Sequence, residues 1–214
     1  QPPQGSVVSF AVGLQMGGLF QVTNALAAVG VALLRRVPVQ AIKNGLEALA
    51  GVPGRFELVP TPGRDFTVLV DYAHTSDGLE NVLRSARALN PTRLVCVFGC
   101  GGDRDAKKRP LMGRISSEIA DLTLLTSDNP RSENPDAIIA DILAGIEGGR
   151  ENPAIVIEVD RHAAIKQALC DLARPGDLIV IAGKGHETTQ TFAGGRTIPF
   201  DDRLVAREAL AGCP

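Results

Sequence analysis

Short apolar runs and amphipathic stretches alternate along most of this 214-residue chain. The apolar runs have the length of buried strands, and they predict strands over residues 66–70, 93–98, 122–126, 154–159 and 178–182. Apolar residues recur at three- and four-residue steps in the other stretches, which predict helices over residues 76–89, 110–120, 135–146, 161–173 and 202–210. A hairpin is predicted to turn at Gly194 and Gly195. This alternation indicates a Rossmann-like α/β fold, with a mostly parallel sheet and helices on both faces.

The N-terminal part of the chain does not follow this alternation. A strand is predicted over residues 7–12, and two helices are predicted over residues 22–34 and 39–49. Either Thr23 or Asn24 has the side chain to cap the first of these helices.

A Gly- and Pro-rich stretch, residues 50–55, is a predicted hinge. The strand and helices before it are too small for a free domain, and the chain begins without Met. We therefore expect residues 1–54 to be the tail of a preceding domain, cut from a longer chain. Residues 55–214 are expected to form a separate domain.

Composition narrows the class of function. Hydrophobic residues make up 44% of the chain, enough for a core, and the net charge of −2 argues against a nucleic-acid-binding surface. No apolar run reaches the ~18 residues needed to cross a bilayer, so no membrane insertion is expected. The four cysteines lack the spacing of a metal site, and we interpret them as reduced thiols of a cytoplasmic monomer, with Cys96 and Cys170 in the core. They are Cys96, Cys100, Cys170 and Cys213.

Polar loops follow four of the predicted strands. Because the carboxyl ends of parallel strands share one edge of a sheet, we expect these loops to form one ligand site. In residues 126–131, Asp128 and Arg131 can read an ammonium and a carboxylate, the two charged groups of an amino acid. The alternative is a surface turn, because Asp-Asn-Pro favours turns in any case.

The loop after residues 93–98 is rich in glycine. Gly99 and Gly101 match only part of a dinucleotide fingerprint, because Arg104 stands where its third glycine belongs. No Walker A motif occurs either. Arg104 remains a candidate carboxylate ligand, since its guanidinium can bind two oxygens at once. Lys107 and Arg109 are interpreted as a solvated basic loop.

Two further loops supply candidate groups. In residues 183–187, Glu187 can accept hydrogen bonds from an ammonium, whereas His186 is interpreted as a packing or hydrogen-bonding residue in preference to an acid or base. Asp71 is placed to hold a ribose hydroxyl, and the alternative is a helix cap, which Thr75 or Ser76 can supply without it. Spacing alone thus indicates an amino-acid-like or nucleotide ligand.

The order of these motifs adds a resemblance. The chain resembles the Mur ligase family over almost its whole length, from about residue 18 to the last helix. The motifs are Asp71-Tyr72-Ala73-His74-Thr75, Phe98-Gly99-Cys100-Gly101-Gly102-Asp103-Arg104-Asp105, Lys108-Arg109-Pro110-Leu111-Met112-Gly113, Asp128-Asn129-Pro130-Arg131 and Gly183-Lys184-Gly185-His186-Glu187. The resemblance implies three domains: one for a UDP-sugar, a central ATPase domain and a C-terminal Rossmann-like domain. This chain is similar to the end of the second and all of the third.

The resemblance also implies a reaction. Members most similar to this chain add meso-2,6-diaminopimelate to UDP-N-acetylmuramoyl-L-alanyl-D-glutamate in peptidoglycan synthesis, which serves cell-wall formation, cell shape and division. ATP phosphorylates the acceptor's carboxylate, the incoming amine attacks the acyl phosphate, and phosphate leaves. The ligands for ATP and Mg²⁺ lie mostly upstream in this family. The resemblance therefore implies no catalytic residue and no metal ligand within this segment, and we expect the segment alone to be inactive.

Site residues carry over from the motifs of the family. The resemblance implies a diaminopimelate site formed by Arg104, Asp128, Asn129, Pro130, Arg131, Gly183 and Glu187. It implies ATP contacts from Asn24, Arg55 and Asp71, although Gln21 departs from the Asn usual in the family. Two alternatives stay open: a relative that adds L-lysine or L-ornithine, against which Arg131 speaks, and a non-catalytic module that binds an amino acid or nucleotide.

Overall fold

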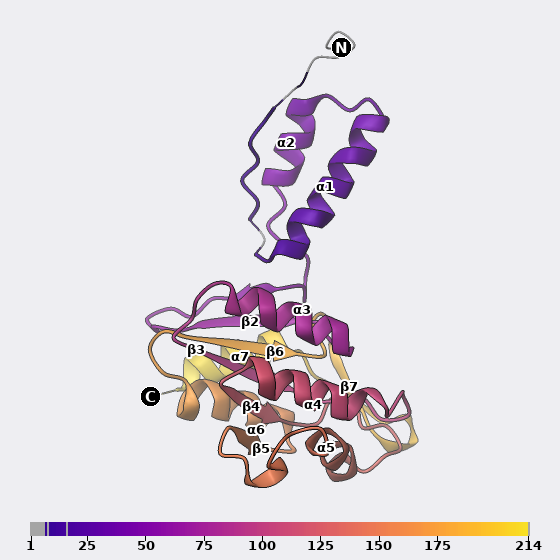
Figure 1. The fold of residues 1–214 in the computed structure, drawn as a ribbon, viewed down its shortest axis with the longest axis vertical. Helices are drawn as coiled ribbons and strands as arrows, with labels where there is room; N and C mark the ends of the chain where they lie inside the picture. Colours follow the sequence, from indigo (N-terminus) through magenta and orange to yellow (C-terminus); the bar gives the residue numbers. More distant parts are fainter. Residues whose placement is uncertain (1–6, 8, 16, 214) are drawn as a thin grey trace. The chain divides into compact units, whose positions relative to one another are not determined.

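The structure is a computed structural model, and it describes residues 7, 9–15 and 17–213. The chain divides into two compact units, the first ending at Val52 and the second beginning at Pro53. Figure 1 shows a pair of helices in the first unit and a sheet with its covering helices in the second.

The first unit contains α1 (Leu19–Leu34) and α2 (Val39–Glu47). Helix α1 begins three residues before the predicted start, because Gly18 at φ 92° provides the non-helical residue that precedes it. Neither Thr23 nor Asn24 is its cap, which corrects that prediction. Helix α2 follows Pro38, as expected for a proline at a helix start.

The strand predicted over residues 7–12 is not present in its described residues. Residues 7 and 9–12 form no strand, and Val8 lies outside the described residues. A strand needs a neighbour to bond its N–H and C=O groups, and the described part of the first unit contains no such partner. Apolar residues alone therefore do not predict a strand here.

The second unit is built on a six-stranded, mostly parallel sheet, which confirms the predicted fold class. The strands are β1 (Glu57–Val59), β2 (Thr67–Asp71), β3 (Arg93–Phe98), β4 (Leu122–Leu125), β5 (Ile155–Ile157) and β6 (Asp177–Ala182). Their spatial order is β1-β2-β6-β3-β4-β5, and only β1 is antiparallel to its neighbour. Strand β1 was not predicted, because it is three residues long and only Val59 in it is buried.

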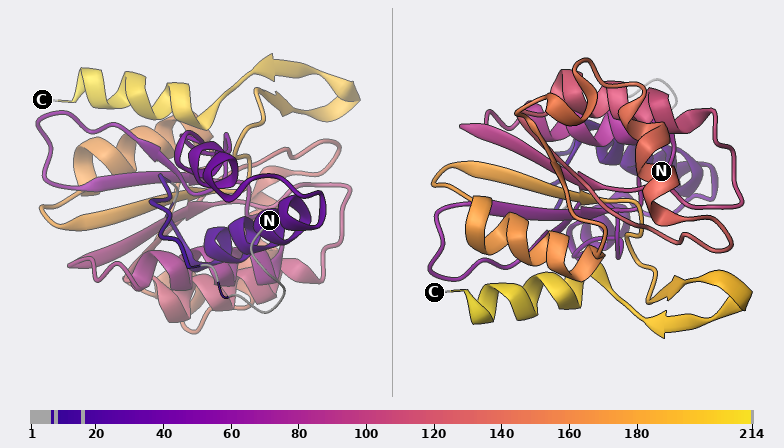
Figure 2. Two further views of the ribbon diagram at one scale, coloured as in Figure 1. Left: turned by 90° about the horizontal axis from the view of Figure 1, so that it is seen from above. Right: turned by 90° about the horizontal axis from the view of Figure 1, so that it is seen from below.

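Helices cover both faces of this sheet. Figure 2 shows α3, α4 and α5 on one face and α6 and α7 on the other. The helices are α3 (Ser76–Arg87), α4 (Lys108–Ile119), α5 (Pro135–Leu143), α6 (Arg161–Lys166), a π-helix (Gln167–Leu172) and α7 (Asp202–Gly212), with short 3₁₀ turns at Gly149–Glu151 and Ala193–Gly195. Strands β7 (Thr189–Thr191) and β8 (Thr197–Pro199) form the predicted hairpin as a separate two-stranded sheet.

The core lies on both faces of the central strands. Side chains point alternately to the two faces of a strand, so Val95 and Val97 of β3 pack in one layer with residues of α6 and α7. Cys96 and Phe98 point to the other layer and are also fully buried. This double burial explains why the strands appear in the sequence as continuous apolar runs.

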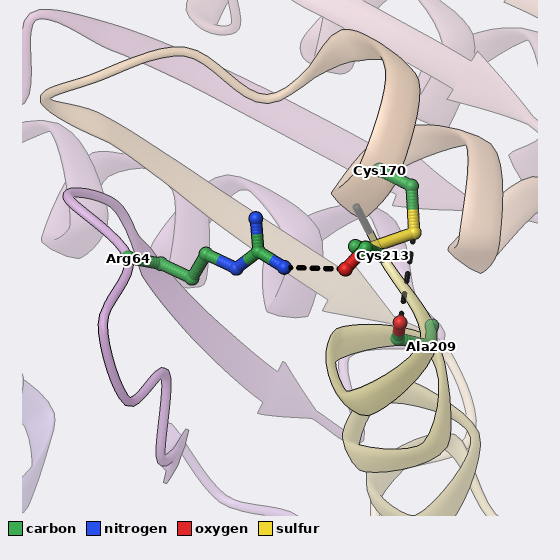
Figure 3. The surroundings of a disulfide bond; sticks show 4 residues. All are labelled: Arg64, Cys170, Ala209 and Cys213. Atoms are coloured by element: carbon green, nitrogen blue, oxygen red, sulfur yellow. Dashed lines mark hydrogen bonds between the residues drawn. A yellow bond between two sulfur atoms is a disulfide. The ribbon is translucent and has the colours of Figure 1, made fainter.

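A disulfide joins Cys170 to Cys213, with the two Cα atoms 5.2 Å apart (Figure 3). The prediction of four reduced thiols was therefore wrong, because packing of α7 against the π-helix brings together two cysteines 43 positions apart. Arg64 Nη2 donates to the Cys213 carbonyl at 2.9 Å beside this bond. Cys96 and Cys100 are buried free thiols, and burial raises the pKa of each to about 12. None of the described helices has the length and apolarity to cross a lipid bilayer.

Candidate functional site

The four polar loops lie at one edge of the sheet, as the strand order predicts. Strands β2, β6, β3 and β4 are adjacent and parallel, so their carboxyl ends are side by side. Backbone hydrogen bonds join the loops directly: Gly183 N donates to Asp71 O at 3.0 Å, and Gly102 N donates to Asn129 O at 2.9 Å. The loops therefore form a single polar edge.

The loop at residues 126–131 is held by the β7–β8 hairpin. Gln190 Nε2 donates to Asp128 O at 2.6 Å, and Thr191 N donates to Asn129 Oδ1 at 3.0 Å. Arg131 N donates to Thr191 O at 3.1 Å. Asp128 and Asn129 are only 6% and 7% exposed, so the interpretation as an ordinary surface turn does not hold.

Arg131 is held by the glycine-rich loop. Its φ is 51°, a left-handed conformation that is uncommon outside glycine, and its Nη1 donates to Gly102 O at 2.7 Å. A Cβ on Gly101 would lie 2.9 Å from that same Nη1, and a Cβ on Gly102 would lie 1.9 Å from Pro130 O. These glycines thus permit close packing of two loops, and they explain a cluster that only partly matched a dinucleotide fingerprint.

Arg104 is exposed at the outer side of this loop. Its Nη1 donates to Asp103 O at 3.0 Å, and it forms no ion pair with another described residue. The structure therefore places Arg104 on the loop beside Arg131 without bringing it into contact with Asp128 or Glu187.

Arg109 is not part of a solvated basic loop, which corrects that interpretation. It is 2% exposed, and its guanidinium forms ion pairs with Glu133 and Asp141, each at 2.8 Å. Glu133 also accepts a hydrogen bond from Asp103 N at 2.6 Å. These contacts fasten the glycine-rich loop to the segment after Arg131. Lys107 is exposed, in agreement with its interpretation.

Lys184 is a site residue that sequence reasoning missed. It is 0% exposed, and its Nζ donates to Asn129 Oδ1 and to Glu187 Oε2, both at 3.0 Å, with Asp128 Oδ1 at 3.6 Å. The signal was a lysine between two glycines at the end of a buried strand. That pattern does not have the spacing of a phosphate-binding loop, so it does not by itself predict a role for the lysine.

The carboxyl groups of this cluster have opposite pKa shifts. Burial raises the pKa of Asp128, although the charges of Arg161 and Lys184 oppose the rise. Burial by itself would raise the pKa of Glu187 too, but hydrogen bonds from Asn129 and Lys184, together with nearby positive charge, bring it below the usual value. The contacts around Glu187 therefore favour its charged form.

A buried ion pair lies beneath the cluster and was also missed. Arg161 and Asp202 are fully buried and make two hydrogen bonds of 2.8 Å, and Arg161 Nη2 donates to Ala182 O at 2.9 Å. A Cβ on Gly183, which has φ 118°, would lie 3.6 Å from Asp128 Oδ2 and 3.8 Å from Arg161 Nη2. Gly183 thus provides the turn that brings the ion pair close to Asp128.

Asp71 fastens the start of the second unit. Its two oxygens accept hydrogen bonds from Phe56 N at 2.7 Å and Ala73 N at 2.8 Å, and the side chain is buried. Burial raises its pKa despite these bonds. The helix cap is Thr75, whose hydroxyl accepts from Gly78 N, as the alternative interpretation allowed.

Arg55 and the rings of Tyr72 and His186 form a small cluster at the same edge. The Arg55 guanidinium lies 4.9 Å from the Tyr72 ring centroid, and the His186 ring lies 5.1 Å from it. This contact favours the interpretation of His186 as a packing residue.

Asn24 lies in the first unit, where its Nδ2 donates to Gln21 Oε1 at 3.2 Å. Among the described residues, no group of three or more His, Cys, Asp or Glu side chains has the arrangement of a metal site.

Comparisons with known proteins show which proteins this chain is similar to. Two ligases named UDP-N-acetylmuramoyl-L-alanyl-D-glutamate–2,6-diaminopimelate ligase are close relatives in sequence. The one from Syntrophomonas wolfei is 52% identical over 95% of this chain, and the one from Gloeobacter violaceus is 54% identical over 91%. The chain spans 41% and 39% of their respective lengths, about two fifths of each relative.

Comparison with solved structures gives a relative of the same name. A ligase of the same name is 40% identical, with a TM-score of 0.71 over 95% of this chain and 40% of its own. A Mycobacterium tuberculosis folylpolyglutamate synthase is 20% identical with a TM-score of 0.66 over 95% of this chain and 42% of its own, which shows a shared fold. Residues 54–185 match the family described as "Mur ligase, glutamate ligase domain", and this match covers more than half of the chain. The chain therefore belongs to the Mur ligase family.

Proposed function

We propose that this chain is the amino-acid-binding part of an ATP-dependent ligase that adds meso-2,6-diaminopimelate to UDP-N-acetylmuramoyl-L-alanyl-D-glutamate. One observation supports it most: Arg131 and Glu187 lie in loops joined through Asn129 at one sheet edge. The charge of Arg131 is close enough to contribute to the lowered pKa of Glu187. A cation and an anion so placed suit a zwitterion, and the relatives named above carry this activity in their names.

Arg131 is the residue proposed to select the amino acid. Its Nη1 is used by Gly102 O, whereas Nε and Nη2 make no hydrogen bond to another described residue. These two groups remain for a carboxylate, which a guanidinium binds through two parallel hydrogen bonds. Diaminopimelate carries a carboxylate at its distal end and lysine does not, so this contact distinguishes them. Arg104 is proposed to bind a second carboxylate from the neighbouring loop.

Glu187 is proposed to hold an ammonium of the bound amino acid. Its Oε2 accepts from Asn129 Nδ2 at 2.9 Å and from Lys184, whereas Oε1 makes no hydrogen bond within the described part of the chain. Asp128, Asn129, Pro130 and Gly183 are proposed to complete the site as the walls and turns that hold these groups. A positioned amine is favoured for attack because orientation lowers the entropic part of the barrier.

ATP supplies the phosphoryl group that converts the acceptor's carboxylate into an acyl phosphate with a good leaving group. We propose that Asn24, Arg55 and Asp71 contact ATP, and that its other ligands and those of Mg²⁺ are in a preceding ATPase domain ending near residue 54. The Arg55 guanidinium and the rings of Tyr72 and His186 lie together, and such a group of a cation and flat rings suits contact with a nucleotide. Both Asp71 oxygens are already bonded to backbone N–H groups, so a ribose contact requires a shared hydrogen bond.

The proposal extends to the setting of the reaction. The ligase is proposed to act in the cytoplasm as a monomer in peptidoglycan precursor synthesis, and to bind the UDP-sugar through residues outside this chain. The alternative is the addition of L-lysine or L-ornithine, and the side chain of Arg131 argues against it. A third possibility, an isolated binding module, differs from the ligase in lacking ATP turnover.

Isothermal titration calorimetry of the chain tests the choice of ligand. We expect meso-diaminopimelate to bind at least tenfold more tightly than L-lysine, since an unpaired binding group costs more than ~1.4 kcal/mol. Equal affinities, or tighter binding of lysine, would contradict the assignment. A longer version carrying the upstream sequence should form ADP in the presence of both substrates, and an inactive longer version that still binds the amino acid would favour the binding module.

A further inference from the structure

Lys184 has an environment unusual for lysine. Lysine is almost never fully buried unless its ammonium is paired, and Lys184 is 0% exposed. It lies in the turn that follows β6, between Gly183 and Gly185, both of which have positive φ angles. The turn bends back on itself, because Glu187 N donates to Lys184 O at 2.9 Å. The backbone thus directs the lysine inward and returns Glu187 beside it.

The three contacts of the Lys184 ammonium all lead to the proposed amino-acid site. One contact holds the Asn129 amide oxygen, which also accepts from Thr191 N, so the amide group of Asn129 has one orientation. That orientation directs Asn129 Nδ2 to Glu187 Oε2 at 2.9 Å. Lys184 donates to the same Oε2. One oxygen of Glu187 is therefore bound from two sides, while the other stays available.

We propose that Lys184 is the positioning residue of the amino-acid site: by holding Glu187 Oε2 and the Asn129 amide oxygen, it presents Glu187 Oε1 to the ammonium of the incoming amino acid. This inference rests on the proposed function, because it assigns Glu187 an ammonium ligand. Lys184 itself is too deeply buried to contact that ligand directly. It acts through its two neighbours.

A lysine suits this position better than a neutral residue. Its ammonium donates to Asn129 Oδ1 and Glu187 Oε2, and its positive charge lies between Glu187 and Asp128, whose Oδ1 is 3.6 Å away. Two carboxylates with no cation between them would repel each other. The lowered pKa of Glu187 agrees with this arrangement, since Lys184 contributes to it through a hydrogen bond and through its charge.

A double-mutant cycle tests whether Lys184 acts through Glu187. Calorimetry with meso-diaminopimelate compares the chain with Lys184→Met, Glu187→Gln and the double variant. Each single change should weaken binding about tenfold or more, and the double variant should bind no worse than about twofold below the weaker single variant. Losses that multiply, or a Lys184→Met variant that binds as the unchanged chain does, would overturn the inference. Lys166→Met, at an exposed position in α6, is the matched control and should change nothing.

A second measurement needs no ligand and separates this inference from the proposed function. Nuclear magnetic resonance titration of the Glu187 side-chain carboxyl carbon should give a higher pKa in Lys184→Met than in the unchanged chain. An unchanged Glu187 pKa overturns the inference even if diaminopimelate binds. Absence of diaminopimelate binding by the unchanged chain, with the Glu187 pKa still dependent on Lys184, overturns the proposed function instead. If Lys184→Met does not fold, Lys184→Gln, which keeps a donor without the charge, gives the same comparison.

Discussion

The position of the Arg131 side chain depends on two glycines, Gly101 and Gly102. Its guanidinium donates to Gly102 O in the space beside Gly101, where a Cβ would be 2.9 Å from Nη1. The sequence does not reveal this contact, because Arg131 and Gly102 are 29 positions apart and each has an ordinary interpretation alone. The family resemblance implies a site role for Arg131, and the structure shows which groups hold its side chain.

Gly101→Ala should therefore impair the site more than the fold. The added methyl group displaces the Arg131 side chain, whereas the backbone of Gly101 has no positive φ and tolerates alanine. We expect a loss of diaminopimelate affinity of about tenfold, measured by calorimetry, with a change in unfolding free energy below ~1 kcal/mol. Gly45→Ala, where no atom lies within 4 Å of the new Cβ, is the control. Unaltered affinity in Gly101→Ala would show that the position of the Arg131 side chain beside Gly101 does not matter for diaminopimelate binding.

At the scale of elements, the sequence predicts the bounds of fully buried strands better than those of partly exposed ones. Strand β3 has the bounds predicted for it, because every residue after Arg93 in it is buried and the apolar run is continuous. Strand β1 was missed, and the helix predicted over residues 161–173 ends at Lys166 and continues as a π-helix. The apolar period is compatible with either helical form, so pattern alone does not separate them. The ion pair between Arg109 and Glu133 joins side chains from separate parts of the chain, and the spacing of apolar residues does not predict such contacts.

Helix α7 is fixed at its start by Asp201. Its side chain accepts from Arg203 N at 2.9 Å as the N-cap and pairs with the Arg203 guanidinium at 2.6 Å. Burial would raise the pKa of Asp201, but the hydrogen bonds from Arg203 outweigh it and lower the pKa. A lowered folded-state pKa adds stability above the unfolded-state value of about 4 and loses it as pH falls through the folded-state value.

Asp201→Asn keeps the cap and removes the charge, since asparagine caps helices equally well. Unfolding in urea should therefore show lower stability than the unchanged chain at pH 7, and a smaller decrease in stability between pH 5 and pH 3 (roughly the carboxyl titration range). Parallel stability curves for the two proteins would contradict the assigned ion pair. Asp171→Asn, a change at an exposed position on the π-helix, is the control.

The other end of α7 is fixed by the Cys170–Cys213 disulfide. A cross-link across 43 residues restricts the unfolded chain, so its reduction should lower the free energy of unfolding by about 2–4 kcal/mol. Urea unfolding with and without a reductant measures this, and Cys213→Ser should be insensitive to the reductant. A thiol assay in denaturant should detect only Cys96 and Cys100 before reduction. Detection of all four thiols at that stage would refute the bond.

At the scale of the whole molecule, the sequence predicted the parallel sheet and the shared edge of its loops. Both follow from the order of the elements, because parallel strands must place their carboxyl ends together. The interior of the site was not predictable in the same way. Arg161 and Asp202 form their ion pair only after α6 and α7 have packed, and Lys184 contacts Asn129 only after the loops that follow β6 and β4 have come together. Each is a common residue type with no distinctive local sequence. The chain also spans about two fifths of the length of its relatives.

The central claim is that Arg131 selects a diamino acid with a distal carboxylate, and its most direct test is the Arg131→Ala change. Calorimetry compares meso-diaminopimelate with L-lysine on the unchanged chain, on Arg131→Ala and on the exposed control Arg207→Ala. We predict that Arg131→Ala loses about 2–5 kcal/mol of diaminopimelate binding while its lysine binding stays the same, which removes the preference. The control should keep that preference in full. An Arg131→Ala variant that still prefers diaminopimelate by the original margin would contradict the account.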